Sequence, residues 1–197
     1  MSVELLTALA VFSFVSAVTP GPNNFMVLAA AANYGMRGAA PVVAGVCCGF
    51  VFMMTLIGLG LIRLFTAFPV TYTVLKTASI VYLLYLSWKI ATAVLPGGGD
   101  GGRPVGFLQA VLFQWVNPKA WVMALTAMSA YRQPSDSIAS VFVVTLVFGA
   151  ITVPSVTAWA LLGTQVRRFL TDARRMRVFN VSVAVLLVGS LYPIVFD

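Results

Sequence analysis

The stretch Thr19-Pro20-Gly21-Pro22-Asn23-Asn24 lies in the middle of an uncharged run from Leu5 to Met36. As a single helix this run would be about 48 Å long, well beyond the roughly 30 Å of a bilayer's hydrocarbon core. Each proline removes a backbone N–H and crowds the carbonyl four residues earlier, and it disfavours a helical conformation for the residue before it. We therefore expect two half-helices joined by a polar break. Lipid cannot satisfy the freed backbone groups, so the break should face protein or a water-filled cavity.

The composition is that of a membrane protein. The 197 residues are 60% hydrophobic and only 9% charged, and the mean hydropathy is +0.99. One soluble core cannot absorb so much apolar surface, so a bilayer is an expected partner. The net charge of +7 does not predict a nucleic-acid partner, because the apolar segments leave no soluble basic surface.

Six apolar segments predict an all-α polytopic membrane protein with six transmembrane helices. The first four cover residues 5–33 (with the break at 20–22), 39–62, 70–95 and 106–131 (interrupted at Asn117-Pro118-Lys119). The fifth lies within the uncharged stretch 137–166, and the sixth covers 178–196. Residues 96–104 are rich in glycine and should form a flexible linker near the centre of the chain. We expect residues 1–197 to form a single membrane transport domain, with two three-segment halves, 1–95 and 105–197, joined by this linker.

The two halves share a plan. The first segment of each half carries a proline-centred break, and Pro20 and Pro118 are 98 residues apart. Because each half has an odd number of spans, the halves would be inserted with opposite orientations. Many secondary transporters are inverted repeats of this kind, with a binding site where paired discontinuous helices meet near the midplane.

The basic residues predict the orientation. Eight lie in or beside the loops that follow segments one, three and five, and three lie on the other side. The eight are Arg37, Lys89, Arg103, Arg167, Arg168, Arg174, Arg175 and Arg177; the three are Arg63, Lys76 and Arg132. The positive-inside rule then places both termini outside the cytoplasm.

The first break has the chemistry to bind a zwitterion. Asn23 and Asn24 would start the second half-helix, where asparagine is a good N-cap and free N–H groups favour an anion. Carbonyls released by Pro20 and Pro22 would suit an ammonium group. Substrate-binding candidates are Pro20, Gly21, Pro22, Asn23, Asn24, Asn117, Pro118 and Lys119. The alternative is a proline kink capped by asparagine, with no ligand.

Lys119 lies near the centre of the fourth segment, too deep for its stem to reach an interface about 15 Å away. Ionisable residues at such depth are functional candidates, and Lys119 could bind a substrate carboxylate or carry a proton. It could instead serve only to satisfy carbonyls freed at a break.

Other side chains narrow the chemistry. All five acidic residues lie at segment ends or in loops, which favours neutral over cationic substrates. Histidine is absent, which excludes a histidine metal site, and we expect no metal and no cofactor. Cys47 and Cys48 are adjacent on one segment, so a disulfide between them would be strained. Gly45 and Gly49 form a GxxxG motif typical of helix packing. Further polar residues in the spans could line a pathway: Gln109, Gln114, Thr126, Ser129, Thr152, Ser155 and Thr157.

These motifs together resemble the LysE-type amino-acid exporter family. The similar stretches are 19–23, 34–38 leading to Ala44-Gly45, 82–90, and 113–120 with its Asn117-Pro118-Lys119-Ala120. The chain looks most similar to the cysteine and O-acetylserine exporter branch. The resemblance implies export of small amino acids across the bacterial inner membrane, with no enzymatic activity.

We therefore expect an exporter of small neutral amino acids or derivatives of the cysteine, O-acetylserine, homoserine or threonine type. We expect coupling to the proton gradient, although no acid in a span could carry the proton. One alternative is a membrane thiol–disulfide electron carrier, which needs two cysteines brought together from different segments. Another is a non-transporting membrane scaffold, which would not need polar breaks at matched positions.

Overall fold

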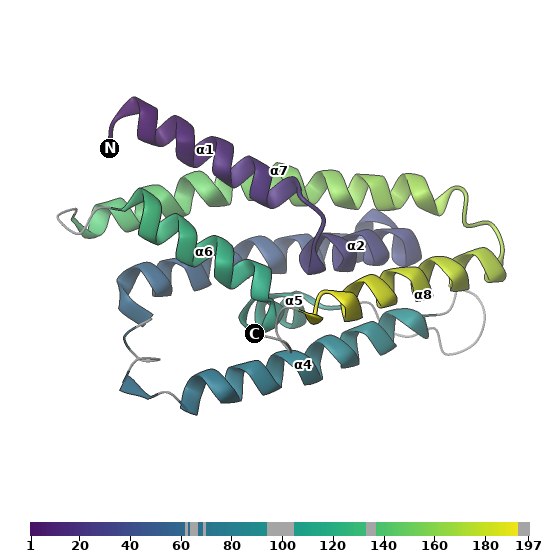
Figure 1. Ribbon diagram of the computed structural model, residues 1–197. Helices are drawn as coiled ribbons and strands as arrows, with labels where there is room; N and C mark the ends of the chain where they lie inside the picture. Colours follow the sequence, from purple (N-terminus) through teal and green to yellow (C-terminus); the bar gives the residue numbers. More distant parts are fainter. Residues whose placement is uncertain (62, 64–66, 69, 94–104, 133–136, 193–197) are drawn as a thin grey trace.

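The computed structural model describes residues 1–61, 63, 67–68, 70–93, 105–132 and 137–192, and Figure 1 traces the path of the chain. The described residues are helical and include no strand. In order, the helices are α1 (Val3–Val18), α2 (Pro22–Leu56), the π-helical turn η1 (Ile57–Leu61), α4 (Val70–Ala91), α5 (Phe107–Val116), α6 (Pro118–Tyr131), α7 (Ile138–Arg167) and α8 (Ala173–Gly189). The expected linker at 96–104 lies outside the described residues.

Both expected breaks are confirmed. α1 ends at Val18, Thr19 is extended, and α2 begins with Pro22 as its first residue. In the second half, extended Asn117 separates α5 from α6, which also begins with a proline, Pro118. Proline suits the first position of a helix because its missing N–H would have no partner there anyway. The prolines thus stop one helix and start the next.

A third interruption divides α2 at Gly35. Its backbone has φ 72° and ψ −178°, a conformation that favours glycine, and two helical stretches meet there. This is the position of the turn expected between the first two apolar segments. The turn takes a single residue, so helix 36–56 begins earlier than the predicted 39 and continues through η1 to Leu61.

Small residues bring the central helices close together. A Cβ on Gly45 would collide with the carbonyl oxygen of Phe107 in α5, and one on Gly49 would lie 2.8 Å from the Cα of Val111. The predicted packing role of the GxxxG motif is therefore confirmed. α2 also packs along α7, whose Gly163 lies against the Leu28 carbonyl. In Figure 1, α4 and α8 lie side by side along one flank, and α1 and α7 lie along the other.

The sixth helix corrects the sequence analysis. α8 begins at Ala173, inside the predicted basic loop, rather than at 178. Asp172 is its N-cap and accepts a hydrogen bond from the Arg175 N–H at 2.8 Å, while its other carboxylate oxygen lies 3.1 Å from the Arg175 side chain. This cap stabilises the start of the helix at Ala173, whereas hydropathy alone predicts a start at 178.

Three of the described helices are long and apolar enough to cross a membrane: Pro22–Leu61, Thr73–Ala91 and Ile138–Arg167. The first has 40 residues, about 60 Å if straight, and is divided at Gly35. Val3–Val18 and Phe107–Val116 are shorter apolar helices that end at the two breaks.

Candidate functional site

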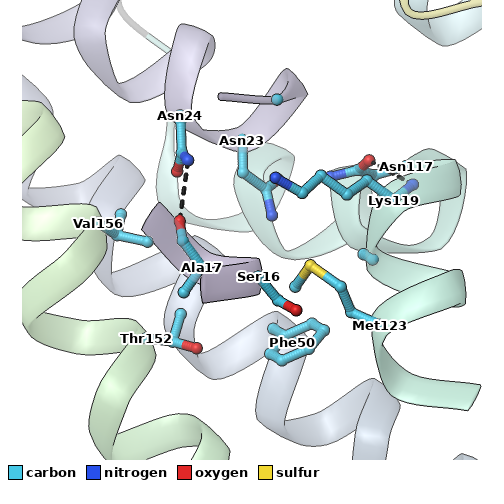
Figure 2. Close-up of a pocket in the computed structure, with 12 residues that line it drawn as sticks. Ser16, Ala17, Asn23, Asn24, Phe50, Asn117, Lys119, Met123, Thr152 and Val156 are labelled. Atoms are coloured by element: carbon cyan, nitrogen blue, oxygen red, sulfur yellow. Dashed lines mark hydrogen bonds between the residues drawn. The ribbon is translucent and has the colours of Figure 1, made fainter. Parts of the chain in front are cut away.

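The two breaks meet although they are about 100 residues apart in sequence, and Thr19 and Pro20 remain exposed there. Lys119, near the start of α6, extends toward the first break, where its ammonium donates to the Thr19 carbonyl at 2.5 Å and the Pro20 carbonyl at 3.3 Å. Figure 2 shows this side chain extending toward Asn23. Lys119 therefore donates hydrogen bonds to backbone carbonyls at the break in the opposite half of the chain.

A pair of amides joins the halves beside this lysine. The Asn23 amide donates to Gln114 Oε1 at 2.8 Å, and the Gln114 amide donates to Asn23 Oδ1 at 3.0 Å. Gln114 is fully buried and donates a second hydrogen bond to the Ala110 carbonyl. A buried amide group is costly unless hydrogen-bonded, so this reciprocal pair holds the two breaks in register.

The other two asparagines satisfy backbone groups at the helix ends. Buried Asn24 donates to the Ala17 and Thr19 carbonyls at 3.0 and 2.9 Å, which caps the C-terminal end of α1. Asn117 is the N-cap of α6 and accepts from the Lys119 N–H at 3.1 Å. The prediction that Asn23 or Asn24 caps the second half-helix was wrong. The N-cap is Gly21, because α2 already begins at Pro22 and both asparagines therefore lie inside its first turn.

A small cavity of about 20 Å³ lies where these groups converge (Figure 2). Gly21 lets Lys119 cross the first break, since a Cβ there would lie 2.7 Å from the lysine Cδ. Five of the eight residues expected at a substrate site line the cavity: Gly21, Asn23, Asn24, Asn117 and Lys119. Pro20, Pro22 and Pro118 are outside the lining and act through the backbone, by ending or starting helices.

The remaining lining comes from parts of the chain that sequence reasoning left unselected. It consists of Ser16, Ala17, Phe50, Ala120, Met123, Thr152 and Val156. Thr152 belongs to the polar span residues named from the sequence, as does Gln114 beside the cavity. Phe50, Met123 and Val156 carry no signal that separates them from other apolar residues of the spans. Their position depends on how α2, α6 and α7 pack.

The site is closed. A cavity of about 20 Å³ holds roughly one water molecule, far less than an amino acid needs. Its polar groups include one cation, three amides and the hydroxyls of Ser16 and Thr152, and no carboxylate lies in its wall. Such a set suits a small ligand that carries a carboxylate and other hydrogen-bonding groups, once the helices around it separate.

Comparison with known proteins is consistent with these features. The profile of a family described as LysE type translocator matches residues 14–190, a range that includes both breaks. A cysteine/O-acetylserine efflux protein of Escherichia coli strain K12 is 31% identical over 189 residues, covering 95% of this chain and 96% of the relative. The Shigella sonnei protein of the same name gives the same values. No solved structure gives a significant match.

These relatives are efflux proteins and the family is one of translocators, not of enzymes. With the long apolar helices, this makes the chain a multi-pass membrane protein that moves a small molecule. The family profile covers most of the chain and the relatives align over almost their entire length, so this chain belongs to the LysE type translocator family.

Proposed function

We propose that this protein exports small neutral amino acids or their derivatives from the cytoplasm, and that the meeting point of the two breaks is its substrate site. The observation that carries the proposal is the position of Lys119, a cation from one half held on the carbonyls that the other half's break exposes. Each half thus supplies one part of a site that neither could form alone.

In this structure Lys119 occupies the place that a substrate ammonium group would take. The Thr19 and Pro20 carbonyls are acceptors for a cation, and the lysine ammonium is a donor for a carboxylate. A zwitterion could satisfy both groups at once, with its carboxylate on Lys119 and its ammonium on the released carbonyls. Binding would replace the contact between Lys119 and the carbonyls by two contacts with the substrate. Neither the lysine nor the carbonyls would then be left without a partner.

This exchange requires the helices to move. The cavity is too small for an amino acid, and the Asn23–Gln114 pair bridges the halves beside it. We propose alternating access, in which the two halves separate on one side of the breaks and then on the other. Broken helices suit such motion, because their ends can shift without distorting a continuous hydrogen-bond ladder.

The architecture that fits this mechanism has six spans in two inverted halves, 1–95 and 105–197, joined by a linker at 96–104 in a single transport domain. α1 with the first part of α2 would form one broken span, and α5 with α6 would form its counterpart. Helix 36–61 would correspond to α7, and α4 to α8. The packing of α4 against α8 and the matched proline starts of α2 and α6 support this arrangement.

The basic residues support an orientation with both termini on the periplasmic side of the inner membrane. Arg167 and Arg168 at the end of α7 and Arg174, Arg175 and Arg177 at the start of α8 cluster at one end of the molecule. The positive-inside rule assigns that end to the cytoplasm.

The substrate class follows from charge and from the relatives' names. No carboxylate lies in the wall of the cavity, which disfavours lysine and arginine as substrates. The relatives named for cysteine and O-acetylserine efflux favour those compounds, with homoserine and threonine as others of similar size. We propose coupling to the proton gradient.

A thiol–disulfide carrier is disfavoured by the cysteines, because Cys47 is buried, Cys48 is exposed, and both belong to one helix. A non-transporting scaffold would leave the converging polar groups at the breaks without a role.

The test is efflux from proteoliposomes loaded with a panel of labelled amino acids, with and without an imposed pH gradient. We expect release of small neutral substrates, faster with the gradient, and at least a tenfold loss for Lys119→Met, the factor for one charge-assisted hydrogen bond. Lys76→Met on α4 is the control, since Lys76 does not line the cavity. Unchanged export by Lys119→Met, or no efflux of any substrate by the wild-type protein, would overturn the proposal.

A further inference from the structure

A second reciprocal amide pair lies near the turn at Gly35. Asn33 donates to Asn180 Oδ1 at 2.7 Å, and Asn180 donates to Asn33 Oδ1 at 2.9 Å. Asn33 is 2% exposed and Asn180 is 0% exposed. Asn180 also donates to the Ala93 carbonyl at 3.2 Å. The pair therefore ties together the first part of α2, α8 and the residues that follow α4.

A second cavity of about 20 Å³ lies beside Asn33, one member of this pair. Its wall contains Asn33, Tyr34, Lys89, Ala93 and apolar residues of α2. Lys89 is half-buried, and its ammonium has no hydrogen-bond or ion-pair partner among the residues that the structure describes. A half-buried cation facing a cavity is a group that can bind an anion at little cost.

Both cavities lie along one face of the same helix. Asn23, Met26, Ala30 and Asn33 follow one another at intervals of three and four residues, which places them on one side of α2. Asn23 lines the first cavity, and the other three line the second. Asn23 and Asn33 are about 15 Å apart along the helix axis. A substrate moving along this face would pass from one cavity to the other.

We infer that the second cavity is a further substrate site on the same pathway, in which Lys89 binds the carboxylate of a small amino acid. The Asn33–Asn180 pair closes it, and the pair must separate for substrate to pass. This inference rests on the proposed export function. The two sites share their chemistry, since each combines a lysine with a reciprocal amide pair that bridges segments distant in sequence.

The first test distinguishes an effect on substrate binding at Lys89 from an effect on the rate of transport. In proteoliposomes with substrate on the side of Lys89, Lys89→Met should raise the half-saturating concentration about tenfold, the factor for one charge-assisted hydrogen bond, and leave the maximal rate within about twofold. Lys89→Arg should restore most of the affinity, and Lys76→Met on the same helix is the matched control. An unchanged half-saturating concentration for Lys89→Met would overturn the inference. A wild-type protein that transports nothing would instead refute the function on which it rests.

The second test cross-links the two positions of the amide pair so that they cannot separate. Asn33→Cys and Asn180→Cys are combined in a Cys47→Ala/Cys48→Ala background and treated with a short bifunctional thiol reagent whose linker is cleaved by reduction. Export should stop on cross-linking and return on reduction, whereas each single-cysteine variant should be unaffected by the reagent. Full export by the cross-linked protein would show that the pair does not separate and would overturn the inference.

Discussion

The pairing of Asn23 with Gln114 allows a quantitative test of whether the two breaks meet. The pair has two hydrogen bonds, at 2.8 and 3.0 Å, between residues 91 positions apart. Interhelical hydrogen bonds in membrane proteins average about 0.6 kcal/mol in double-mutant cycles, so two should give a coupling of about 1.2 kcal/mol. Gln114→Ala should cost more than Asn23→Ala, because Gln114 is fully buried and also bonds to the Ala110 carbonyl.

The measurement is the free energy of unfolding in mixed micelles for the wild type, the two single alanine variants and the double variant. We expect each single variant to lose about 1–3 kcal/mol, because it leaves a buried amide without its partner. The double variant should lose about 1 kcal/mol less than the sum of the two. The difference reports the interaction itself, since the burial of each side chain cancels in the cycle.

A matched control uses one residue from each amide pair. Asn23→Ala combined with Asn180→Ala removes one amide from each cluster, and these two residues share no hydrogen bond. Their effects should add to within about 0.5 kcal/mol. A coupling between Asn23 and Gln114 as small as that between Asn23 and Asn180 would refute the view that the breaks are bridged here.

Three further predictions concern stability, each measured by unfolding in the same micelles. Gly49→Leu should cost about 1–3 kcal/mol by overpacking the contact of α2 with α5, whereas Gly189→Ala, which meets nothing within 4 Å, should be neutral or stabilising. Asn24→Leu should cost about 1–3 kcal/mol, because it leaves two carbonyls at the end of α1 without a donor, and equal stability to wild type would contradict that cap. Asp172→Ala should cost about 0.5–2 kcal/mol through loss of the N-cap of α8, and Asp172→Asn should recover most of it.

The helix breaks could be predicted because their cause is local. Pro20, Pro22 and Pro118 remove backbone donors and restrict the residues before them, so α1 and α5 end just before these prolines and α2 and α6 begin at them whatever surrounds the helices. The single-residue turn at Gly35 was harder to locate, because an isolated glycine in an apolar run is also common inside helices. Its positive φ identifies it only once the backbone is known.

The roles of the asparagines could not be predicted. The sequence places Asn23 and Asn24 at the start of a helix, where capping is the ordinary function of asparagine. Their actual partners are Gln114, 91 residues away, and the carbonyls at the end of α1. The sequence analysis placed the start of α8 too late for a different reason. The arginines of the first turns lower the local hydropathy, although Asp172 caps the helix there.

The sequence by itself determined that this is a membrane protein of the LysE type, with a proline-centred interruption in each half and one lysine deep in the second. Composition, proline stereochemistry and spacing are properties of the chain alone. Only the tertiary structure decided that Lys119 covers the carbonyls of the opposite break, that Phe50 and Met123 close the cavity, and that Asn33 pairs with Asn180 beside Lys89. Such contacts depend on the rotation and depth of each helix relative to its neighbours, which packing across the whole bundle sets and no single segment encodes.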